Sequence, residues 1–445
     1  MEPRTPSRRT FLALSMGLPV GAALAACGTS GPGGGAGGGG NAGNATYWFL
    51  SAQPAEGVRR SAVDRFNKAN PNGQITATTF QNDAYKTKIK TALGAGQAPT
   101  LVFGWGGGTL RSYVQAGQVD DLTPWLDQNP AVRARLFDSA FGAGTVNGKV
   151  YALPIERVQP IVLYYNKKLF EQIGASPPQS WGDIMDLVPK FNAKGIAPFS
   201  LAGQSRWTNM MWLEFLFDRI GGPEVFQAVF DGEKDAWSNP ASIDALTKVQ
   251  DLVKAKGFIK GFSSITADSN ADQALLHTGK AAMMLHGSWS YGILATEGGD
   301  FVPSGSLGYM SFPPVDGGKG DPSNTVGNPA QYLSIYSQAT PAQKDIAKKF
   351  LSTGLSTDAE VKDWIATGSV PIVKGTESLL SASKDAEWLS FVYGVASKAK
   401  TFGQSWDQAL SPTAAEVLLD NISSLFQLSI SPKEFVSNMN AVIGK

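Results

Sequence analysis

The stretch that decides the fold spans residues 46–103 and reads TYWFLSAQPAEGVRRSAVDRFNKANPNGQITATTFQNDAYKTKIKTALGAGQAPTLVF. It contains three short apolar segments, at 46–50, 75–80 and 100–103, whose length and β-branched or aromatic content predict buried strands. A helix is expected between each pair of strands. The order strand, helix, strand, helix, strand predicts parallel βαβ units and therefore an open α/β sheet.

The two expected helices are marked by the spacing of their apolar residues and by glycine. Val58, Ala62 and Phe66 recur every four residues, which places them on one face of the first helix. The second helix begins at about residue 83, and Gly94 with Gly96 would close it.

Polar and aromatic residues follow the three predicted strands where each strand ends. Ligands of open α/β sheets bind beyond the carboxyl ends of the strands, so a binding site is expected in these loops. They supply the candidates Gln53, Asn82, Asp83, Trp105 and Gly106. Asp83 has a simpler interpretation as a helix cap, and the glycines around Trp105 would let the backbone come close to a ligand.

The rest of the chain continues the α/β pattern without a detectable internal repeat. Helices are expected after Ser180, where Asp183 completes a capping box, and after Thr340, where a proline follows the cap residue. Further strands are predicted at 161–165, 281–285, 309–312 and 332–336. The strand at 281–285 leads directly into Gly287-Ser288-Trp289.

The first 26 residues have the organisation of an export signal. Arg4, Arg8 and Arg9 precede an apolar segment at 11–26 that is short and interrupted by serine, glycine and proline. A spanning helix needs about 20 apolar residues, so a cleaved signal peptide is the better interpretation. The run SRRTFL at 7–12 resembles a twin-arginine signal. A general-secretion signal with two adjacent arginines is the alternative.

Cys27, the only cysteine, closes the sequence Leu24-Ala25-Ala26-Cys27. This sequence resembles the lipobox of bacterial lipoproteins, in which the thiol receives a diacylglycerol. A single cysteine has no disulfide partner in the chain, so lipidation is the favoured explanation, and two acyl chains suffice for stable anchoring. Residues 28–45 are nearly all Gly, Ala, Ser, Thr and Asn, which predicts a flexible tether after the lipidated cysteine.

Composition limits what the folded part can be. About 400 residues follow the tether, more than one core usually spans, so two domains are expected. The whole chain has a formal net charge of +1, and removing residues 1–26, with three arginines and one glutamate, leaves it near zero. A near-neutral chain offers no basic face for nucleic acid. Its 11 tryptophans and 17% charged residues suit a neutral, amphipathic ligand.

Four stretches carry a family resemblance: ALGAGQAPTLV at 92–102, YALP at 151–154 with LYYNKKLF at 163–170, GKAAM at 279–283 with GSW at 287–289, and the strand at 308–314 leading to Val326-Gly327-Asn328. In this order after a lipobox, they resemble the extracellular solute-binding protein family 1, the carbohydrate-binding subunits of ABC importers. The segment WDQAL at 406–410 resembles the binding proteins for xylobiose and chito-oligosaccharides, and xylobiose is the first candidate.

The resemblance implies a two-lobed periplasmic-binding-protein-like fold of type II, in which chain crossings join two α/β lobes and the sugar lies in the cleft between them. Lobe 1 would hold 46–155 and 329–370, and lobe 2 would hold 156–328 and 371–445. The lobes would close by hinge motion. The protein would be a monomer on the extracellular face of the cytoplasmic membrane and would pass its oligosaccharide to the permease subunits of an importer.

The resemblance also places Trp289 and Trp207 at sugar-stacking positions. Flat aromatic rings cover the apolar faces of sugar rings, a contact comparable to an aromatic pair. Trp105 and Trp406 are further candidates, each with a packing role as the alternative, and Asp407 follows Trp406. The other tryptophans are expected to pack in the core or against helices.

Sugar hydroxyls need polar partners, and four more residues are candidates for this role. Glu156 stands at the first crossing between the lobes, and Asn328 and Gln331 flank the second, where they could contact either hinge or sugar. Arg206 has five N–H donors and could bind adjacent hydroxyls or pair with a surface carboxylate.

Catalysis is not expected, and neither is a metal or a cofactor. No nucleophile elbow, phosphate loop or metal-ligand cluster stands out, and His277 and His286 are the only histidines. A glycoside hydrolase, which needs two carboxylates at a fixed separation, is the enzyme alternative. The same fold presenting its ligand to a sensor, or binding a non-sugar solute, is the other.

Overall fold

The computed structural model of the chain describes residues 43–444. The predicted signal peptide, Cys27 with its lipobox, and most of the predicted tether lie outside the described residues. In the described part, no helix combines the length and the apolar character needed to cross a membrane.

The first sheet is built largely from the stretch that predicted the fold. Its strand order is β2-β1-β3-β12-β6. β1, β2 and β3 are parallel as predicted, whereas β12 runs antiparallel to β3 and to β6, so the sheet is mixed and not wholly parallel. The bounds are β1 Ala45–Leu50, β2 Ile75–Phe80, β3 Leu101–Gly104, β6 Leu153–Ile155 and β12 Gln331–Ile335.

Helices α1 (Ala55–Ala69) and α2 (Asn82–Gly94) make the two crossovers between the parallel strands. Val58, Ala62 and Phe66 are buried along α1, as their spacing predicts. The remaining elements around this sheet are α3 Gly107–Gln115, α4 Thr123–Gln128, α5 Pro130–Arg135, β4 Thr145–Val146, β5 Lys149–Val150, α13 Pro341–Thr353, α14 Asp358–Ala366 and α15 Glu377–Ser381. α13 begins at the predicted cap, where Thr340 forms a capping box with Gln343.

The second sheet has the order β13-β11-β7-β9-β8, and β10 pairs with β7 outside this path. β7 and β9 are antiparallel, and every residue of β9 is buried. The bounds are β7 Gln159–Asn166, β8 Ala197–Phe199, β9 Ala281–Gly287, β10 Leu307–Met310, β11 Thr325–Asn328 and β13 Phe402–Gln404. The strand predicted at 309–312 therefore lies two residues earlier.

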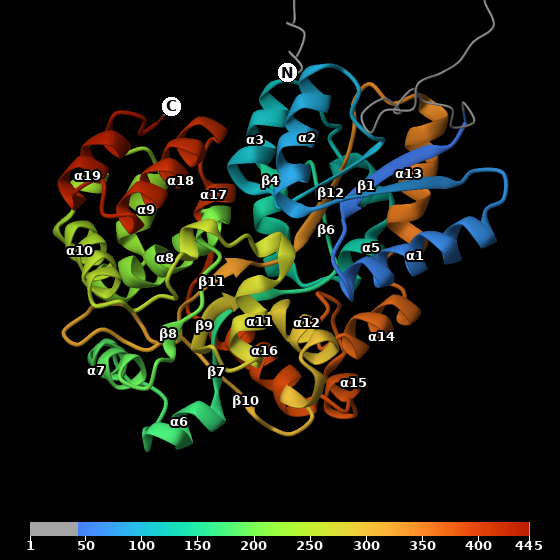
Figure 1. The fold of residues 1–445 in the computed structure, drawn as a ribbon. Helices are drawn as coiled ribbons and strands as arrows, with labels where there is room; N and C mark the ends of the chain where they lie inside the picture. The colour runs from blue at the N-terminus through green and yellow to red at the C-terminus, as the bar shows by residue number, and fades with distance from the viewer. Residues whose placement is uncertain (1–42, 445) are drawn as a thin grey trace, which may run out of the picture. The chain divides into compact units, whose positions relative to one another are not determined.

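Helices cover both faces of the second sheet (Figure 1). The apolar sides of α7 Trp181–Asn192, α8 Trp207–Gly221, α10 Pro240–Lys254, α18 Pro412–Phe426 and α19 Pro432–Asn440 form one core with it. On the other face, α11 Ala271–His277, α12 Ser290–Glu297 and α16 Ala386–Lys398 contribute to a core that is continuous with that of the first sheet. The remaining helices are α6 Lys167–Ile173, α9 Glu224–Phe230 and α17 Trp406–Ala409.

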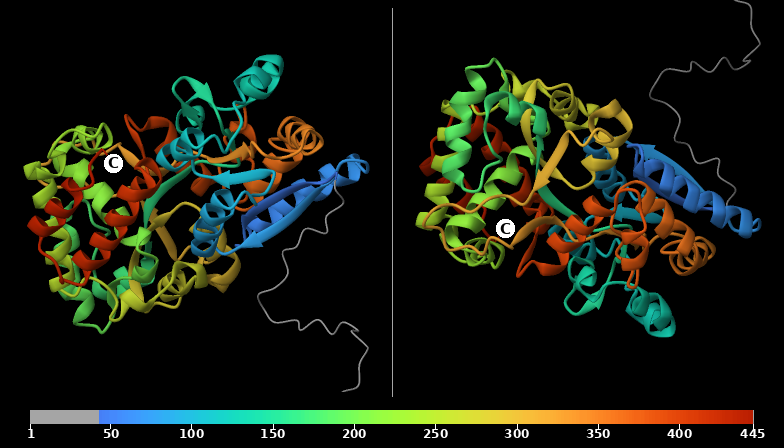
Figure 2. Two further views of the ribbon diagram at one scale, coloured as in Figure 1. Left: turned by 90° about the horizontal axis from the view of Figure 1, so that it is seen from above. Right: turned by 90° about the horizontal axis from the view of Figure 1, so that it is seen from below.

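We call the parts built on the first and second sheets lobe 1 and lobe 2. Figure 2 shows β1 and α1 of lobe 1 (blue) at the opposite end from the C-terminal helices of lobe 2 (red). The two lobes bear out the predicted α/β, two-lobed fold class. Each sheet takes its strands from within one predicted lobe, and the bounds of the lobes stay a prediction.

Three segments of the chain run between the two sheets. The first joins β6 to β7 at 156–158, and the second joins β11 to β12 at 329–330. The third contains Val370 and Ile372 and runs beside the first. Val158 N–H donates to Val370 O at 3.0 Å, and Ile372 N–H donates to Glu156 O at 3.1 Å. These backbone hydrogen bonds fix the crossings to one another at the base of the cleft.

Candidate functional site

Two adjoining cavities lie in the cleft between the lobes. The inner cavity, of about 150 Å³, is lined by residues that include Arg157, Gln273, Trp289, Asn328 and Gln331. The outer cavity, of about 580 Å³, is lined by residues that include Asp83, Tyr113, Arg206, Tyr332 and Glu416. Both are bordered by Lys86, Trp105, Trp207, Asp407 and Gln408. Residues of both lobes therefore surround one divided cleft.

Two tryptophans of lobe 2 form the aromatic side of the inner cavity. The ring centroids of Trp207 and Trp289 are 6.1 Å apart, and the imidazole of His286 lies edge-on to both, at 5.5 Å and 5.3 Å. Gly287 makes room for this arrangement, since a Cβ there would come within 1.9 Å of the Trp289 ring. The Gly-Ser-Trp sequence thus lets the indole fold back over the end of β9.

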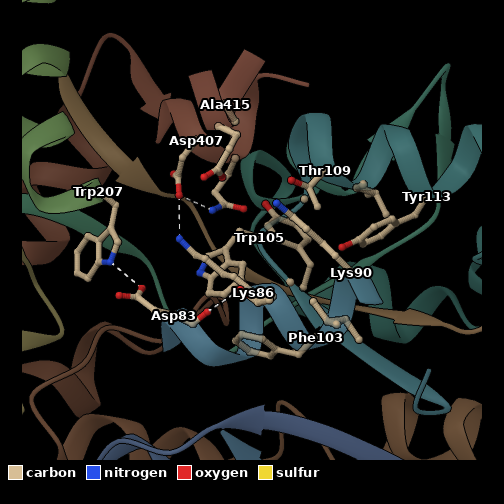
Figure 3. A pocket seen from close by; sticks show the side chains of 18 of the residues that line it. Asp83, Lys86, Lys90, Phe103, Trp105, Thr109, Tyr113, Trp207, Asp407 and Ala415 are labelled. Carbon is tan, nitrogen blue, oxygen red and sulfur yellow. Dashed lines mark hydrogen bonds and ion pairs between the residues drawn. The ribbon is translucent and has the colours of Figure 1, made fainter. Parts of the chain in front are cut away.

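Asp83 connects α2 of lobe 1 to the aromatic side of lobe 2. Its Oδ1 accepts the Trp207 indole N–H at 3.1 Å, and its Oδ2 accepts the Ser205 hydroxyl at 2.8 Å (Figure 3). The Asp83 backbone N–H donates to Asp268 across the cleft at 3.2 Å. Asp83 therefore positions Trp207, and it is not the helix cap, because Gln81 is the cap residue of α2.

Trp105 follows β3 and borders both cavities, in agreement with the expectation that this loop lies at the binding site. The adjacent glycines were predicted to let the backbone come close to a ligand, but they have a different role. A Cβ at Gly107 would lie 2.5 Å from Gln408 O, and a Cβ at Gly108 would lie 2.0 Å from Leu410 O. These two glycines let the start of α3 approach α17 of the other lobe, so the backbone that comes close belongs to the chain itself.

Several buried polar atoms around the inner cavity have no hydrogen-bond partner among the described residues. They include Arg157 Nε, Gln273 Oε1, Asn328 Oδ1 and Gln331 Oε1. Buried polar groups are normally hydrogen-bonded, so a cluster of free donors and acceptors around one cavity needs an explanation. A ligand with several hydroxyl groups can both donate to and accept from such a set.

Arg157 contributes a cation to the lining of the inner cavity. Its guanidinium packs over the Trp364 ring at 4.6 Å and donates to Ser369 Oγ at 2.9 Å. Burial lowers its pKa to about 10, and it makes no salt bridge within residues 43–444. Its remaining N–H groups are therefore available to oxygen atoms in the cavity.

Three predicted site residues are either away from the cavities or paired with other side chains. Gln53 is exposed and lines neither cavity. Glu156 is buried in a bidentate ion pair with Arg59. Arg206 borders the outer cavity but pairs with Glu416 at 2.9 Å and with Asp420 at 2.6 Å. It therefore has the alternative role considered for it, pairing with surface carboxylates.

The prediction for Trp406 is wrong, because its ring is packed inside lobe 2. It is 3% exposed and stacks on Phe226 with centroids 4.3 Å apart and an interplanar angle of 7°. The neighbouring Asp407 points the other way, into the cleft. Successive side chains on a helix diverge by about 100°, so one of the two residues is in the core and the other borders the cavities.

The structure also brings residues to the cleft that the sequence analysis did not propose as site residues. Lys86, Arg157, Gln159, Gln273 and His286 line the inner cavity. Lys86 follows Asp83 by three residues on a predicted helix, and that spacing could have identified it. The other four lie on elements whose orientation the sequence left open.

Asp272, His286 and Ser290 form a buried set that resembles a hydrolytic triad. Ser290 Oγ lies 2.7 Å from His286 Nδ1, and Asp272 Oδ2 lies 3.3 Å from His286 Nε2. Ser290 is 0% exposed, however, so a substrate carbonyl cannot reach its hydroxyl. The set acts as a packed support behind the two tryptophans. Within residues 43–444, no group of His, Cys, Asp and Glu side chains is arranged to hold a metal ion.

Glu214 on α8 is a buried carboxyl that fixes the start of α17. Its Oε1 accepts the Trp406 backbone N–H at 2.7 Å. Burial raises the pKa of Glu214 to about 8, and the charge of Asp407 adds to the increase. In the unfolded chain this carboxyl has its ordinary pKa of 4.5. Between about pH 4.5 and about pH 8, the folded protein therefore retains a proton that the unfolded chain has lost. Its contribution to stability is complete below about pH 4.5 and is lost as the pH rises toward about 8.

We expect Glu214→Gln to reduce this loss of stability. The amide can still accept the Trp406 N–H through its oxygen but carries no charge at any pH. At pH 9 the variant should unfold at a higher urea concentration than the unsubstituted protein, and the difference should be smaller at pH 4. Glu233→Gln, at an exposed position, serves as the control and should have no such effect. A Glu214→Gln difference independent of pH would contradict the assignment.

The fold and the cleft together define a two-lobed binding protein. Known proteins agree with this class. The model of a family described as bacterial extracellular solute-binding protein matches residues 51–361. Because the match spans well over half of the chain, the chain belongs to the bacterial extracellular solute-binding protein family. By family, it is a binding protein and not an enzyme.

Curated relatives are similar along much of their length. A probable sugar-binding periplasmic protein of Mesorhizobium japonicum is 28% identical over 314 residues, which are 67% of this chain and 69% of the relative. The multiple sugar-binding protein of Streptococcus mutans is 24% identical over 335 residues, covering 74% and 75%. The match to an uncharacterized ABC transporter extracellular-binding protein of Pyrococcus horikoshii, 24% identical, spans only 56% of each chain.

Solved structures cover more of the chain. A structure from a study of xylan utilization by the thermophilic bacterium Caldanaerobius polysaccharolyticus has a TM-score of 0.80 and 30% identity, covering 90% of this chain and 100% of that one. A chitin oligosaccharide binding protein has a TM-score of 0.80 and 24% identity, covering 90% and 97%. At 24% identity, the likeness to the chitin oligosaccharide binding protein shows a shared fold alone.

Proposed function

We propose that the protein captures a neutral di- or oligosaccharide in the cleft between its lobes and delivers it to the permease of an ABC importer. The observation that carries the proposal is the inner cavity, whose lining combines Trp207 and Trp289 with residues that have unpaired buried polar atoms. Sugars offer both surfaces that such a cavity matches, because their hydroxyls form hydrogen bonds and their C–H faces stack on aromatic rings.

The charges in the cleft favour a neutral ligand. Lys86 is paired with Asp407, and Arg206 is paired with Glu416 and Asp420, so these groups largely cancel. Among the described residues, Arg157 at the inner cavity and Lys90 at the outer cavity have no salt bridge, while Asp268 adds an acid to the lining of the inner cavity. A phosphate would favour a cluster of cations and a polyamine a cluster of acids, whereas the lining of this cleft mixes acidic and basic side chains.

Xylobiose or a short xylo-oligosaccharide is our first candidate. The structure from the study of xylan utilization, at 30% identity over nearly the whole described chain, supports this choice. A chito-oligosaccharide is the second candidate. It is supported by a 32% identity over 130 residues, 28% of this chain, to the diacetylchitobiose binding protein NgcE of Streptomyces coelicolor.

The proposal includes an anchor and a partner. Cys27 would carry the lipid that holds the protein at the extracellular face of the cytoplasmic membrane, with residues 28–45 as the tether. The closed lobes would be recognised by the transmembrane subunits as a monomer. Presentation of the ligand to a sensor instead would leave the cleft unchanged and would be revealed by a ligand-dependent signalling partner.

A thermal-shift screen tests the proposed ligand class. Xylobiose, xylotriose, chitobiose and maltose should be compared with glycerol phosphate, a short peptide and spermidine. A ligand that binds only the folded state stabilises it by about 2.7 kcal/mol at a concentration of 100 times Kd. We expect a rise in Tm with at least one neutral saccharide. A rise only with a charged solute or the peptide would contradict the proposal, and turnover of a saccharide would revive the hydrolase alternative.

A further inference from the structure

Lys86 spans the cleft from one lobe to the other. It stands on α2 of lobe 1, and its Nζ lies 2.8 Å from Asp407 Oδ2 on α17 of lobe 2 (Figure 3). The same oxygen accepts a hydrogen bond from Gln408 Nε2 at 2.7 Å. The Asp407 side chain is only 6% exposed, so water and salt screen this ion pair less than they screen a surface pair. Lys86 is thereby held in an extended position across the cleft.

The Lys86 ammonium also lies beside two tryptophan rings. It is 5.2 Å from the ring centroid of Trp105 and 6.0 Å from that of Trp207. Both distances are within the range of about 6 Å over which an aromatic face attracts a cation. These are aromatic faces on which a sugar ring would stack. Lys86 therefore occupies the space between Trp105 and Trp207 that a bound ring needs.

Lys86 is one of the residues that separate the inner cavity from the outer cavity. The inner cavity, at about 150 Å³, is smaller than the roughly 300–1,000 Å³ of typical small-molecule sites, whereas the outer cavity, at about 580 Å³, is within that range. Arg157, Asn328 and Gln331, each with an unpaired buried atom, all line the inner cavity. A ligand that uses these atoms and has more than one ring must extend past Lys86.

We propose that Lys86 is a specificity-determining residue that competes with the second ring of a saccharide for the space between Trp105 and Trp207. An oligosaccharide must displace the lysine side chain and break its ion pair with Asp407, and this lowers its affinity. A single ring held in the inner cavity leaves the ion pair intact. Lys86 thus sets how strongly the cleft favours an oligosaccharide over a monosaccharide. This inference rests on the proposed function, because it concerns the same cleft.

Lys86→Ala tests the inference, with Lys88→Ala as the matched control. Lys88 is on the same helix and exposed, lines neither cavity, and lies 5.9 Å from the ring of Trp48. Calorimetric titrations with xylotriose and chitotriose would compare the two variants with the unsubstituted protein. We expect Lys86→Ala to bind the preferred trisaccharide at least tenfold more tightly. Lys88→Ala should bind it with unchanged affinity.

Lys86→Met keeps most of the side-chain bulk but not the charge, and it provides the test if Lys86→Ala does not fold. We expect its affinity gain to be smaller than tenfold, because the methionine still fills part of the space. Unchanged or weaker trisaccharide binding in Lys86→Ala would overturn the inference and would make Lys86 a ligand-binding group or a bystander, while the proposed function would stand. If the unsubstituted protein bound no saccharide, the proposed function and the inference would both fail.

Discussion

Replacing Arg59 by methionine is expected to lower the free energy of unfolding by about 3–5 kcal/mol, the cost of leaving one partner of a buried ion pair alone. Arg59 on α1 donates from Nε to Glu156 Oε1 at 2.7 Å and from Nη2 to Glu156 Oε2 at 2.8 Å. Both residues are 4% exposed. Without the guanidinium, the Glu156 carboxylate would remain buried at the first crossing, close to a second buried acid, Glu360, whose pKa burial raises to about 7.

Urea unfolding of matched variants measures this loss. Arg65→Met is the control, since Arg65 is on the same helix and pairs with Asp363 at 2.7 Å, but the two side chains are 39% and 38% exposed. Exposed pairs contribute about 0–1 kcal/mol. The double variant Arg59→Met/Glu156→Gln should be more stable than Arg59→Met, because no unpaired charge remains buried. Equal losses in Arg59→Met and Arg65→Met would contradict the account.

Trp289→Ala is expected to weaken saccharide binding at least tenfold, which corresponds to about 1.4 kcal/mol. The indole is half-buried at the inner cavity, beside Trp207 and supported by His286. Removing it takes away one face on which a sugar ring stacks, and it leaves the core largely intact because the ring is not enclosed. The variant should therefore unfold at nearly the same urea concentration as the unsubstituted protein.

Trp125→Ala is the control for this substitution, because Trp125 is also half-buried but is on α4, away from both cavities. Calorimetric titration of the two variants with the preferred saccharide separates a binding role from a packing role. Unchanged affinity in Trp289→Ala would remove Trp289 from the site. An equal loss of affinity in both variants would point to a general effect of removing a tryptophan.

The elements that the sequence predicted well are those with strong local signals. α1 shows its four-residue apolar spacing, and α7 and α13 begin at capping boxes formed by Ser180 and Thr340. The strands that were not predicted are β4, β5, β6, β8, β11 and β13. They have two to four residues each, too few to show a period. The antiparallel position of β12 beside β3 was also missed, because pairing between distant segments has no local signature.

The loops after strands led to much of the inner cavity. Candidates from widely separated parts of the chain line it together: Asn82, Trp105, Trp207, Trp289, Asn328, Gln331 and Asp407. The rule that ligands bind beyond the carboxyl ends of strands found the lobe 1 members, and the family resemblance found Trp207 and Trp289. Their role in binding stays a prediction.

The failures at Glu156 and Arg206 share one cause, which is a partner far away in the sequence. Glu156 was placed correctly at a crossing, but Arg59, which neutralises it, is 97 residues away. Arg206 was placed correctly at the cleft, but its partners Glu416 and Asp420 are on α18, more than 200 residues away. Whether a charged side chain faces a ligand or a counter-ion depends on such long-range pairs, and one sequence alone does not contain them.

The central claim is that the inner cavity binds a neutral saccharide. Calorimetric titration of the unsubstituted protein with xylobiose, xylotriose and chitobiose tests it most directly. The account predicts one saccharide per chain with a Kd in the micromolar range, equivalent to about −8 kcal/mol, and this binding should be at least tenfold weaker in Trp289→Ala. Absence of binding to every neutral saccharide, together with tight binding of a charged solute, would contradict it.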